Sequence, residues 1–384
     1  MMKITLKDAN LLTLHKHHLM KVESRLQNIV KIVEDIGGLH ATGTKVPYLS
    51  LFARTANFSV REELDEELFA KKNLGKIRCM RKTLFILPKD LIPIVFAATK
   101  ETVLKTSKKY LEYRGISSDQ YKEISKSIVN ILKGEEMTSS EVKKNLQTKL
   151  NISAILNVMC DQGILLRSHP RKYSLFMDYF PEISLSNLNN QEAINLLVHQ
   201  YLHSFAPVTE KDIIWWSGLT KTKIKEALSN LQGDLLNIEI SDLPGNFILP
   251  HSDLKLLRGL NFSKSPVINL LPWLDPYLMG YKERDRYLDN KHYDMVFDRS
   301  GNATSTILLD GRVIGIWDYT TGSEATIKLF LFEESEEVRR EIYTEAQRIG
   351  KFIAHKEVPI RQCDKMIPLP QRTAGSFMSP LKEC

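Results

Sequence analysis

The sequence predicts an α+β fold, with three tandem winged-helix domains followed by a small C-terminal β-barrel-like domain. Its length of 384 residues exceeds what one hydrophobic core usually supports, so about two to four domains are expected. A pattern of helices followed by a short strand pair occurs three times before Pro250, and short strands with hairpin turns dominate after it. These changes of pattern place the domains at residues 1–113, 114–182, 183–255 and 256–384.

The composition is that of an ordinary globular protein with a basic bias. Apolar residues make up 43% of the chain and charged residues 26%, which are common values. The formal net charge of +7 favours a polyanionic partner, because clustered Lys and Arg side chains release counterions from phosphates.

Export and membrane insertion are not predicted. Residues 1–14 lack the apolar core of a secretory signal, and the longest apolar stretch, Leu91–Ala98, is too short to span a bilayer. The four cysteines stand far apart, without the paired spacing of a zinc or redox site. We therefore expect a reduced, cytoplasmic chain that uses no metal and no organic cofactor.

The first domain is expected to hold three helices and a hairpin. These elements are placed at Arg25–Ile36, Tyr48–Arg54, Val60–Ala70 and Leu74–Leu87. The segment from Lys71 to Lys82, which enters this hairpin, carries six basic residues and no acidic one: Lys71, Lys72, Lys76, Arg78, Arg81 and Lys82. A charged run is commonly a solvated surface, but the wing of a winged helix normally lies against phosphates. We therefore favour DNA contact by these six side chains.

The second domain shows the clearest pattern. A helical stripe of apolar residues runs from Ile124 to Leu132. Thr138 and Glu141 have the spacing of a capping box, which starts a second helix. Lys143 and Lys144 on that helix are candidate DNA contacts.

A third helix, through Ile152 and Met159, is expected to stop at Gly163. Two short strands follow, Ile164–Arg167 and Tyr173–Phe176, around a basic turn. Three helices and a hairpin make a winged helix.

The third domain repeats this order of elements. A helix at Glu192–His203 precedes a second helix that Thr209 caps, with Asp212 at its third position. The third helix begins at Thr220, in the place of a recognition helix, and the strands Ile238–Ile240 and Phe247–Leu249 follow. Its first turn is expected to expose three candidate DNA contacts, which are Lys221, Lys223 and Lys225.

After Pro250 the pattern changes to short strands. They are expected at Val267–Leu271, Thr306–Leu309, Arg312–Trp317 and Ala325–Phe332. Hairpin turns are expected at Asp298–Asn302 and at Asp310–Gly311, and a longer helix at Ser335–Ile349. The pattern indicates either a small β-barrel or a compact sheet closed by a helix.

Four segments of the chain resemble the AlkZ/YcaQ type of winged-helix DNA glycosylases. They are Gly38–Arg54, Met80–Pro88, Pro207–Leu219 and Leu270–Arg284, and together they extend over nearly the whole chain. The resemblance implies three winged helices and a β-barrel that grip duplex DNA with a damaged or modified base. It also implies cleavage of the N-glycosidic bond of alkylated bases, bulky adducts and interstrand crosslinks.

The triplet that aligns with the catalytic element of this family is His40-Ala41-Thr42. The family carries Gln-aliphatic-Gln there, with Gln-aliphatic-Asp and His-aliphatic-Gln variants, so this chain departs from the pattern. Thr42 offers a hydroxyl, and His40 could orient water or contact a phosphate, although a lone His is often structural. A neutral base would need a carboxylate, which the triplet lacks. Asp275 is the candidate to supply one, and a structural Asp that caps a turn is the alternative.

Other polar and aromatic groups are candidates for roles at the site. His15, His17 and His18 lack the companion ligands of a metal site, so an exposed helical face is favoured. Trp215 and Trp216 could stack on a base, but core packing is favoured. Arg78, Arg81 and Lys82 are candidates for a wedge or phosphate contact beside an extruded base.

Two classes of function remain open on the sequence. The first is a monofunctional DNA glycosylase that leaves an abasic site, on a base that could include glucosylated hydroxymethylcytosine of phage DNA in a defence role. The second is a winged-helix DNA-binding regulator without catalysis, which the altered triplet favours. In either case we expect a nucleoid-associated monomer, because no dimerisation heptad is present.

Overall fold

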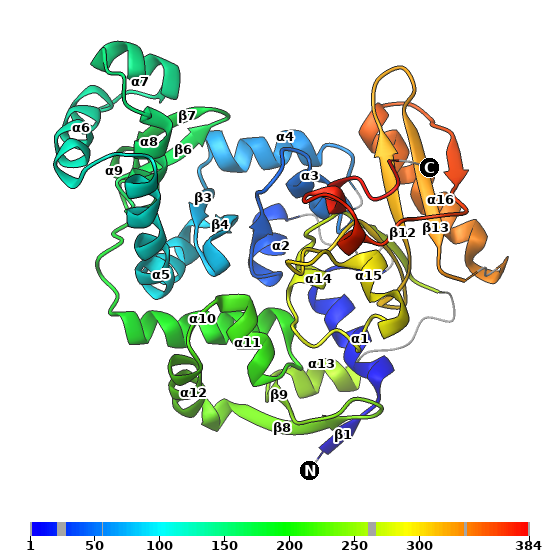
Figure 1. The fold of residues 1–384 in the computed structure, drawn as a ribbon. Helices are drawn as coiled ribbons and strands as arrows, with labels where there is room; N and C mark the ends of the chain where they lie inside the picture. The colour runs from blue at the N-terminus through cyan, green and yellow to red at the C-terminus, as the bar shows by residue number, and fades with distance from the viewer. Residues whose placement is uncertain (1, 21–27, 56, 260–265, 334–335, 383–384) are drawn as a thin grey trace. The chain divides into compact units, whose positions relative to one another are not determined.

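The computed structural model describes the chain except residues 1, 21–27, 56, 260–265, 334–335 and 383–384. The described residues divide into two compact units. Unit 1 comprises residues 1–61, 201–216 and 232–384, and unit 2 comprises residues 62–200 and 217–231. Figure 1 shows the course of the chain through both. No described helix is long and apolar enough to cross a membrane.

Unit 2 contains a basic hairpin and a helical core. Its hairpin strands, β3 (Leu74–Arg78) and β4 (Leu84–Pro88), are antiparallel. The prediction of a hairpin at Leu74–Leu87 is thereby confirmed. The helix expected at Val60–Ala70 is present as α4 (Val60–Asp65) followed by a π-helical turn, Glu66–Ala70.

The elements expected for residues 114–182 are present in the expected order. They are α6 (Ser118–Ile131), α7 (Ser139–Leu146), α8 (Ile152–Asp161), β6 (Leu165–His169) and β7 (Lys172–Leu175). Three further elements that the sequence did not predict accompany them: α5 (Ile92–Tyr113), β5 (Met137–Thr138) and α9 (Phe176–Tyr179). The capping box at Thr138 and Glu141 is confirmed. Apolar side chains of α6, α7 and α8 form one buried cluster with strand residues such as Leu165 and Tyr173. The strand order is β5-β7-β6.

The predicted third round is also present as a series of elements. They are α10 (Asn190–Phe205), α11 (Glu210–Ser217), α12 (Lys221–Asn230), β8 (Leu235–Ile240) and β9 (Phe247–Pro250). Thr209 and Asp212 make the reciprocal cap that the sequence predicts. Trp216 is 5% exposed and packs on Tyr201 and Phe205, so the prediction of core packing is confirmed for this tryptophan. The grouping of these rounds into three winged-helix domains stays a prediction.

The N-terminal part of unit 1 contains elements that the sequence did not reveal. Strand β1 (Met2–Ile4) pairs in parallel with β8, and α1 (Leu6–Lys16) follows with Thr5 as its cap. Helix α2 (Ile29–Asp35) lies within the helix expected at Arg25–Ile36, of which residues 25–27 are outside the described residues. The strand β2 (Leu39–His40) and helix α3 (Val46–Phe52) follow, then α13 (Asp253–Gly259) after β9.

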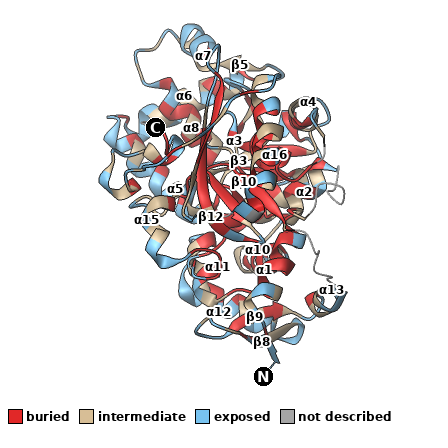
Figure 2. Cartoon of the chain, turned by 90° about the vertical axis from the view of Figure 1, so that its right-hand side faces the viewer, coloured by how far each residue is buried: buried red, intermediate tan, exposed pale blue. Residues whose placement is uncertain are grey.

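A five-stranded sheet dominates the C-terminal part of unit 1. Its strands are β10 (Ile268–Leu271), β11 (Thr306–Leu309), β12 (Arg312–Thr320), β13 (Thr326–Leu331) and β14 (Ile360–Gln362), in that order. Short helices α14 (Pro276–Met279) and α15 (Tyr293–Val296) connect β10 to β11, and α16 (Glu336–Ala354) connects β13 to β14. Figure 2 shows that residues of β10 and β12 are largely buried.

The barrel-like arrangement predicted for residues 256–384 is not formed in the described part of the chain. No strand pairing joins β10 to β14, so the sheet is open there. Helix α16 contacts β10, β13 and β14, and it therefore occupies the place where closure would put the two end strands together. The alternative of a compact sheet closed by a helix describes this region correctly.

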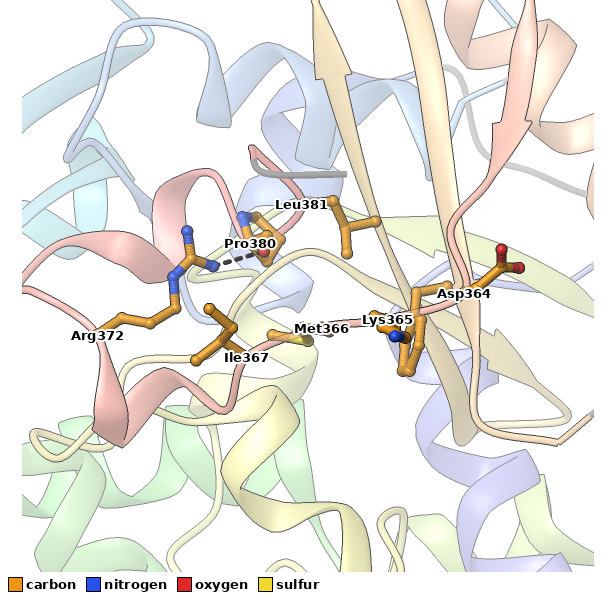
Figure 3. Close-up of a pocket in the computed structure, with 8 residues that line it drawn as sticks. Asp364, Lys365, Met366, Ile367, Arg372, Pro380 and Leu381 are labelled. Carbon is orange, nitrogen blue, oxygen red and sulfur yellow. Dashed lines mark hydrogen bonds between the residues drawn. The ribbon is translucent and has the colours of Figure 1, made fainter.

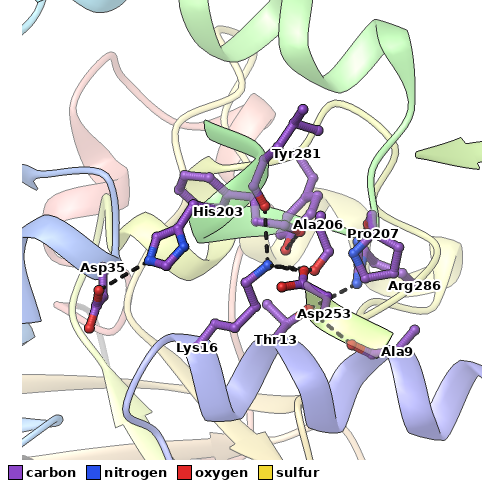
Figure 4. Close-up of polar contacts among 12 residues, drawn as sticks. Ala9, Thr13, Lys16, Asp35, His203, Ala206, Pro207, Asp253, Tyr281 and Arg286 are labelled. Atoms are coloured by element: carbon purple, nitrogen blue, oxygen red, sulfur yellow. Dashed lines mark hydrogen bonds and ion pairs between the residues drawn. The ribbon is translucent and has the colours of Figure 1, made fainter. Parts of the chain in front are cut away.

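Buried polar groups tie α1 to other parts of unit 1. The Lys16 side chain is 5% exposed. Its ammonium donates a hydrogen bond of 2.6 Å to the Asp253 carboxylate and one of 3.1 Å to the Leu202 carbonyl (Figure 4). Burial lowers the pKa of Lys16, while Asp253 opposes that shift. His17 is fully buried, so the expected exposed face of His15, His17 and His18 is wrong for this residue. The described residues contain no group of three His, Cys, Asp or Glu arranged to hold a metal ion.

The cysteines do not all remain thiols. Cys79 and Cys160 are free, and burial raises the pKa of the Cys160 thiol to about 12. Cys363 is disulfide-bonded, so the expectation of a fully reduced chain is wrong for this residue.

Candidate active site

The His-Ala-Thr triplet lies where β2 passes into an exposed loop. His40, the last residue of β2, is 6% exposed. Thr42 and the following residues up to Lys45 are exposed, and α3 begins at Val46. Pro47 in the first turn of α3 fits there because a first-turn backbone N–H needs no intrahelical acceptor. The hydroxyl-bearing residue of the triplet is therefore accessible, whereas the imidazole is enclosed.

Gly43 holds this loop against Trp273. Its φ angle is +83°, and a Cβ atom at this position would lie 2.4 Å from the Trp273 ring. Only glycine combines this backbone conformation with so close an approach. Trp273 is 8% exposed, and its ring meets that of Phe377 edge-on at 5.6 Å. The loop thus rests on a buried aromatic pair.

The other end of α3 is fixed by a fully buried ion pair. The Arg54 guanidinium donates to the Asp275 carboxylate at 2.7 Å and 2.8 Å, and both side chains are 0% exposed. The same guanidinium donates to the Ser50 carbonyl. Asp275 also accepts from the Tyr277 backbone N–H as the N-cap of α14. Asp275 therefore caps a turn, as the structural alternative for this residue expects, and its part in catalysis stays a prediction.

Arg348 of α16 adds a second support to α3. Its guanidinium donates to the backbone carbonyls of Phe52 and Thr55 and pairs with Glu345 at 2.7 Å. It also lies 4.1 Å from the centroid of the Phe52 ring. The exposed triplet loop is therefore carried by a helix that both α14 and α16 hold in place.

Several basic side chains in and beside the hairpin of unit 2 are already paired with carboxylates of the same unit. Lys71 pairs with Glu66 and Glu67. Arg78 donates 3.0 Å to Asp161, a carboxylate that is 2% exposed and also accepts from Ser107 at 2.6 Å.

Lys76 is half-buried over the Phe69 ring, at 5.1 Å from its centroid, and burial lowers the pKa of its ammonium. Lys71, Lys76 and Arg78 are thus three of the six predicted DNA contacts, and each already has a partner side chain within unit 2.

The remaining three predicted contacts in this segment are Lys72, Arg81 and Lys82. Lys72 has its ammonium 4.3 Å from the centroid of the Tyr179 ring, which does not neutralise the charge. Arg81 and Lys82 form the hairpin tip in left-handed backbone conformations, with φ angles of 50° and 62°. Lys82 is exposed. Lys72 and Lys82 therefore keep the positive charge that a phosphate contact needs.

Four of the five other predicted DNA contacts are exposed. They are Lys143 and Lys144 on α7, and Lys221 and Lys225 on α12. The prediction that Lys223 is exposed is wrong, because its side chain is 32% exposed and pairs with Glu101 at 3.0 Å. It also donates to the Asn190 side chain.

The net charge is concentrated in unit 2. Its residues include 24 Lys and Arg side chains against 18 Asp and Glu, a difference of +6 out of the +7 of the whole chain. Unit 1, with the remaining 29 and 28, is close to neutral. The electrostatic attraction for a polyanion therefore comes mainly from unit 2.

A pocket near the C-terminus stands apart from these features. It has a volume of about 550 Å³ and is lined by Phe330, Asp364, Lys365, Met366, Ile367, Arg372, Pro380 and Leu381 (Figure 3). None of these residues belongs to the four segments that carry the family resemblance.

Sequence reasoning missed the residues that build the site around the triplet. Arg54 and Trp273 both lie inside segments that carry the resemblance, so their position was a usable signal. Lys45 lies in the same segment as Arg54, and its ammonium is 5.4 Å from the centroid of the Tyr319 ring. No local pattern marks Arg348, because its role comes from contacts with residues about 300 positions earlier.

The comparisons with known proteins agree on one family. The family model described as DNA glycosylase AlkZ-like matches residues 33–352. An interstrand DNA cross-link repair glycosylase from Streptomyces sahachiroi is 22% identical over 351 residues, which are 86% of this chain and 92% of that protein. The solved structure of Streptomyces sahachiroi DNA glycosylase AlkZ matches with a TM-score of 0.76 at 18% identity, over 94% of this chain and 100% of that one. The chain therefore belongs to the AlkZ-like family of DNA glycosylases.

Proposed function

We propose that this protein hydrolyses the N-glycosidic bond of an alkylated, crosslinked or bulky hypermodified base in duplex DNA and leaves an abasic site. Membership of the AlkZ-like family, over residues 33–352, carries the proposal. The curated relative named as an interstrand DNA cross-link repair glycosylase supports it. The positive charge of unit 2 fits a duplex DNA partner.

In the proposed reaction, the bond between C1′ of the sugar and the base nitrogen breaks, and its electron pair leaves with the base. A water molecule adds to C1′ and gives up a proton. Thr42, accessible at the end of the triplet, is the residue proposed to orient this water through its hydroxyl. His40, enclosed behind the loop, is proposed to orient Thr42 or the water. No step of this reaction needs a metal or an organic cofactor.

The contacts of Asp275 bear on which base is released. Both oxygens of its carboxylate are engaged by Arg54, and one also caps α14, so neither is offered to a sugar cation. A hydroxyl and an imidazole stabilise positive charge less than a carboxylate does. We therefore propose that the preferred substrate carries a cationic, N-alkylated base, which leaves without further assistance. Excision of a neutral glucosylated hydroxymethylcytosine, with a role in phage defence, stays a prediction.

Base release from defined duplexes tests the proposal. Purified protein is incubated with duplexes that carry N7-methylguanine, a nitrogen-mustard crosslink or glucosylated hydroxymethylcytosine, and alkali then cuts the abasic sites. We expect strand breaks with the two cationic lesions, only after alkali treatment, as a monofunctional enzyme requires. DNA binding without breaks on any substrate would instead support a non-catalytic regulator, which the family match does not favour.

Matched variants at Thr42 assign the working group. Thr42→Val keeps the shape and removes the hydroxyl, so it should lose base release, while Thr42→Ser should keep it. Thr42→Gln creates the His-aliphatic-Gln variant of the family and should retain or raise the rate. Equal rates in all three would remove Thr42 from the mechanism.

A further inference from the structure

The cations around α3 are of two kinds. Arg54 and Arg348 donate to backbone carbonyls at the C-terminal end of α3. Each of these two guanidinium groups is neutralised by a carboxylate, Asp275 or Glu345. Lys45 differs from both, because no carboxylate lies within ion-pair distance of its ammonium in the described part of the chain. A net positive charge is therefore left at the exposed end of α3.

The position of Lys45 relates this charge to the triplet. Lys45 is exposed, follows Thr42 by three residues in the same exposed loop, and directly precedes α3. Its ammonium lies 5.4 Å from the centroid of the Tyr319 ring, on β12. A cation over an aromatic face keeps its full charge and still has its N–H groups available to an anion. The ring restricts where the flexible side chain can reach.

The positive charge of Lys45 would not stabilise the sugar of the extruded nucleotide during base release. A positive group beside a developing oxocarbenium ion raises the energy of that state. A phosphate, by contrast, is the anion that every nucleotide brings to such a site, on either side of the sugar. Extrusion rotates a nucleotide by roughly 180° about its backbone, and the flanking phosphates then need partners that hold the new geometry.

We propose that Lys45 is a positioning residue that binds a DNA phosphate flanking the extruded nucleotide, with the Tyr319 ring directing its side chain. The inference rests on the proposed function in taking duplex DNA as the ligand of the triplet loop. It goes further by naming the group of the DNA that is recognised and the side chain that recognises it.

The salt dependence of DNA binding tests this proposal without any base release. The probe is a duplex that carries a tetrahydrofuran abasic-site analogue, which the enzyme cannot cleave. Dissociation constants are measured against sodium chloride concentration for the wild type, Lys45→Ala and Lys45→Arg. One duplex phosphate contact corresponds to a slope of about 0.9 in log K against log salt. We expect Lys45→Ala to reduce the slope by about that amount, and Lys45→Arg to keep it.

Two controls separate this from a general loss of charge or folding. Lys356→Ala removes an exposed lysine of unit 1 that lies outside the triplet loop, and should leave the slope unchanged. Thermal unfolding of Lys45→Ala should match that of the wild type, since the side chain is exposed. Tyr319→Phe keeps the ring and should bind like the wild type.

The outcomes distinguish the two proposals. Wild-type binding with the same slope in Lys45→Ala overturns the role of Lys45 and leaves the proposed glycosylase intact. Binding with the expected loss of slope, but no base release from any lesion, supports the role of Lys45 and overturns the proposed function. A wild type that does not bind the duplex overturns both.

Discussion

Arg54 and Asp275 form a bidentate ion pair, at 2.7 Å and 2.8 Å, between residues 221 positions apart in the sequence. Both side chains are 0% exposed. Removing one partner of a buried pair leaves the other charge without compensation, at a cost of about 3–5 kcal/mol. We therefore expect Asp275→Asn to lower the free energy of unfolding by that order, which denaturant unfolding measures.

A control for this prediction is an exposed ion pair. Glu336 pairs with Arg339 at 2.7 Å, but its side chain is 77% exposed, so Glu336→Gln should cost less than about 1 kcal/mol. If Asp275→Asn unfolds like the wild type but releases no base, the carboxylate acts in catalysis rather than in the fold.

Gly43→Ala should disturb the triplet loop. The new Cβ would lie 2.4 Å from the Trp273 ring, and the φ angle of +83° is unfavourable for alanine. Gly322→Ala is a matched control, because Gly322 has a φ angle of +89° with no atom within 4 Å of the added Cβ. The left-handed conformation alone costs roughly 1–2 kcal/mol. Thermal unfolding should show a larger loss for Gly43→Ala than for Gly322→Ala, and equal losses would contradict the contact with Trp273.

The stability of the protein should fall in acid through Asp35. Burial alone would raise the pKa of this carboxyl, but hydrogen bonds from His18, His203 and Lys31 outweigh it and lower the pKa well below its usual value. Asp35 therefore contributes stability above the unfolded-state pKa of about 3.9, and loses it as the pH falls towards the folded-state pKa.

Asp35→Asn should consequently be less stable than the wild type at pH 7. Its stability should also change less steeply below about pH 4. Urea unfolding at a series of pH values measures both effects. Parallel curves for the two proteins across this range would contradict the role of Asp35.

Substitutions of basic residues in and beside the β3–β4 hairpin should fall into two groups, those that weaken DNA binding and those that lower stability. Lys82→Ala is expected to reduce the salt slope of DNA binding by about 0.9, because Lys82 is exposed and unpaired with any carboxylate among the described residues. Arg78→Ala should instead lower thermal stability, because it leaves the buried Asp161 without its cation. Lys71→Ala, which removes a lysine already paired with Glu66 and Glu67, serves as the control. A full loss of slope in Lys71→Ala would contradict this division.

Local signals in the sequence predicted the elements well. The capping pairs Thr138–Glu141 and Thr209–Asp212 start their helices as expected, because a cap depends only on residues three positions apart. The turn at Asp310–Gly311 joins β11 to β12 with both φ angles positive, as a two-residue hairpin requires.

Non-local contacts were beyond the reach of such signals. Whether Lys223 is exposed depends on Glu101, and whether Asp275 is available depends on Arg54. The open edge of the C-terminal sheet depends on where α16 packs, which strand periodicity does not reveal. The triplet itself was found only through the family resemblance, since His40 and Thr42 form no recognisable pattern on their own.

The separation of Arg54 from Asp275 has a consequence during translation. At about 5–20 residues per second, a ribosome needs roughly 10–45 s to add the intervening chain. Throughout that interval the nascent N-terminal segment, with Arg54 and the triplet, has no carboxylate against which to complete its packing. Unit 2 is contained within the intervening stretch and can fold first. The nascent protein would thus gain its positively charged unit before its triplet loop is assembled.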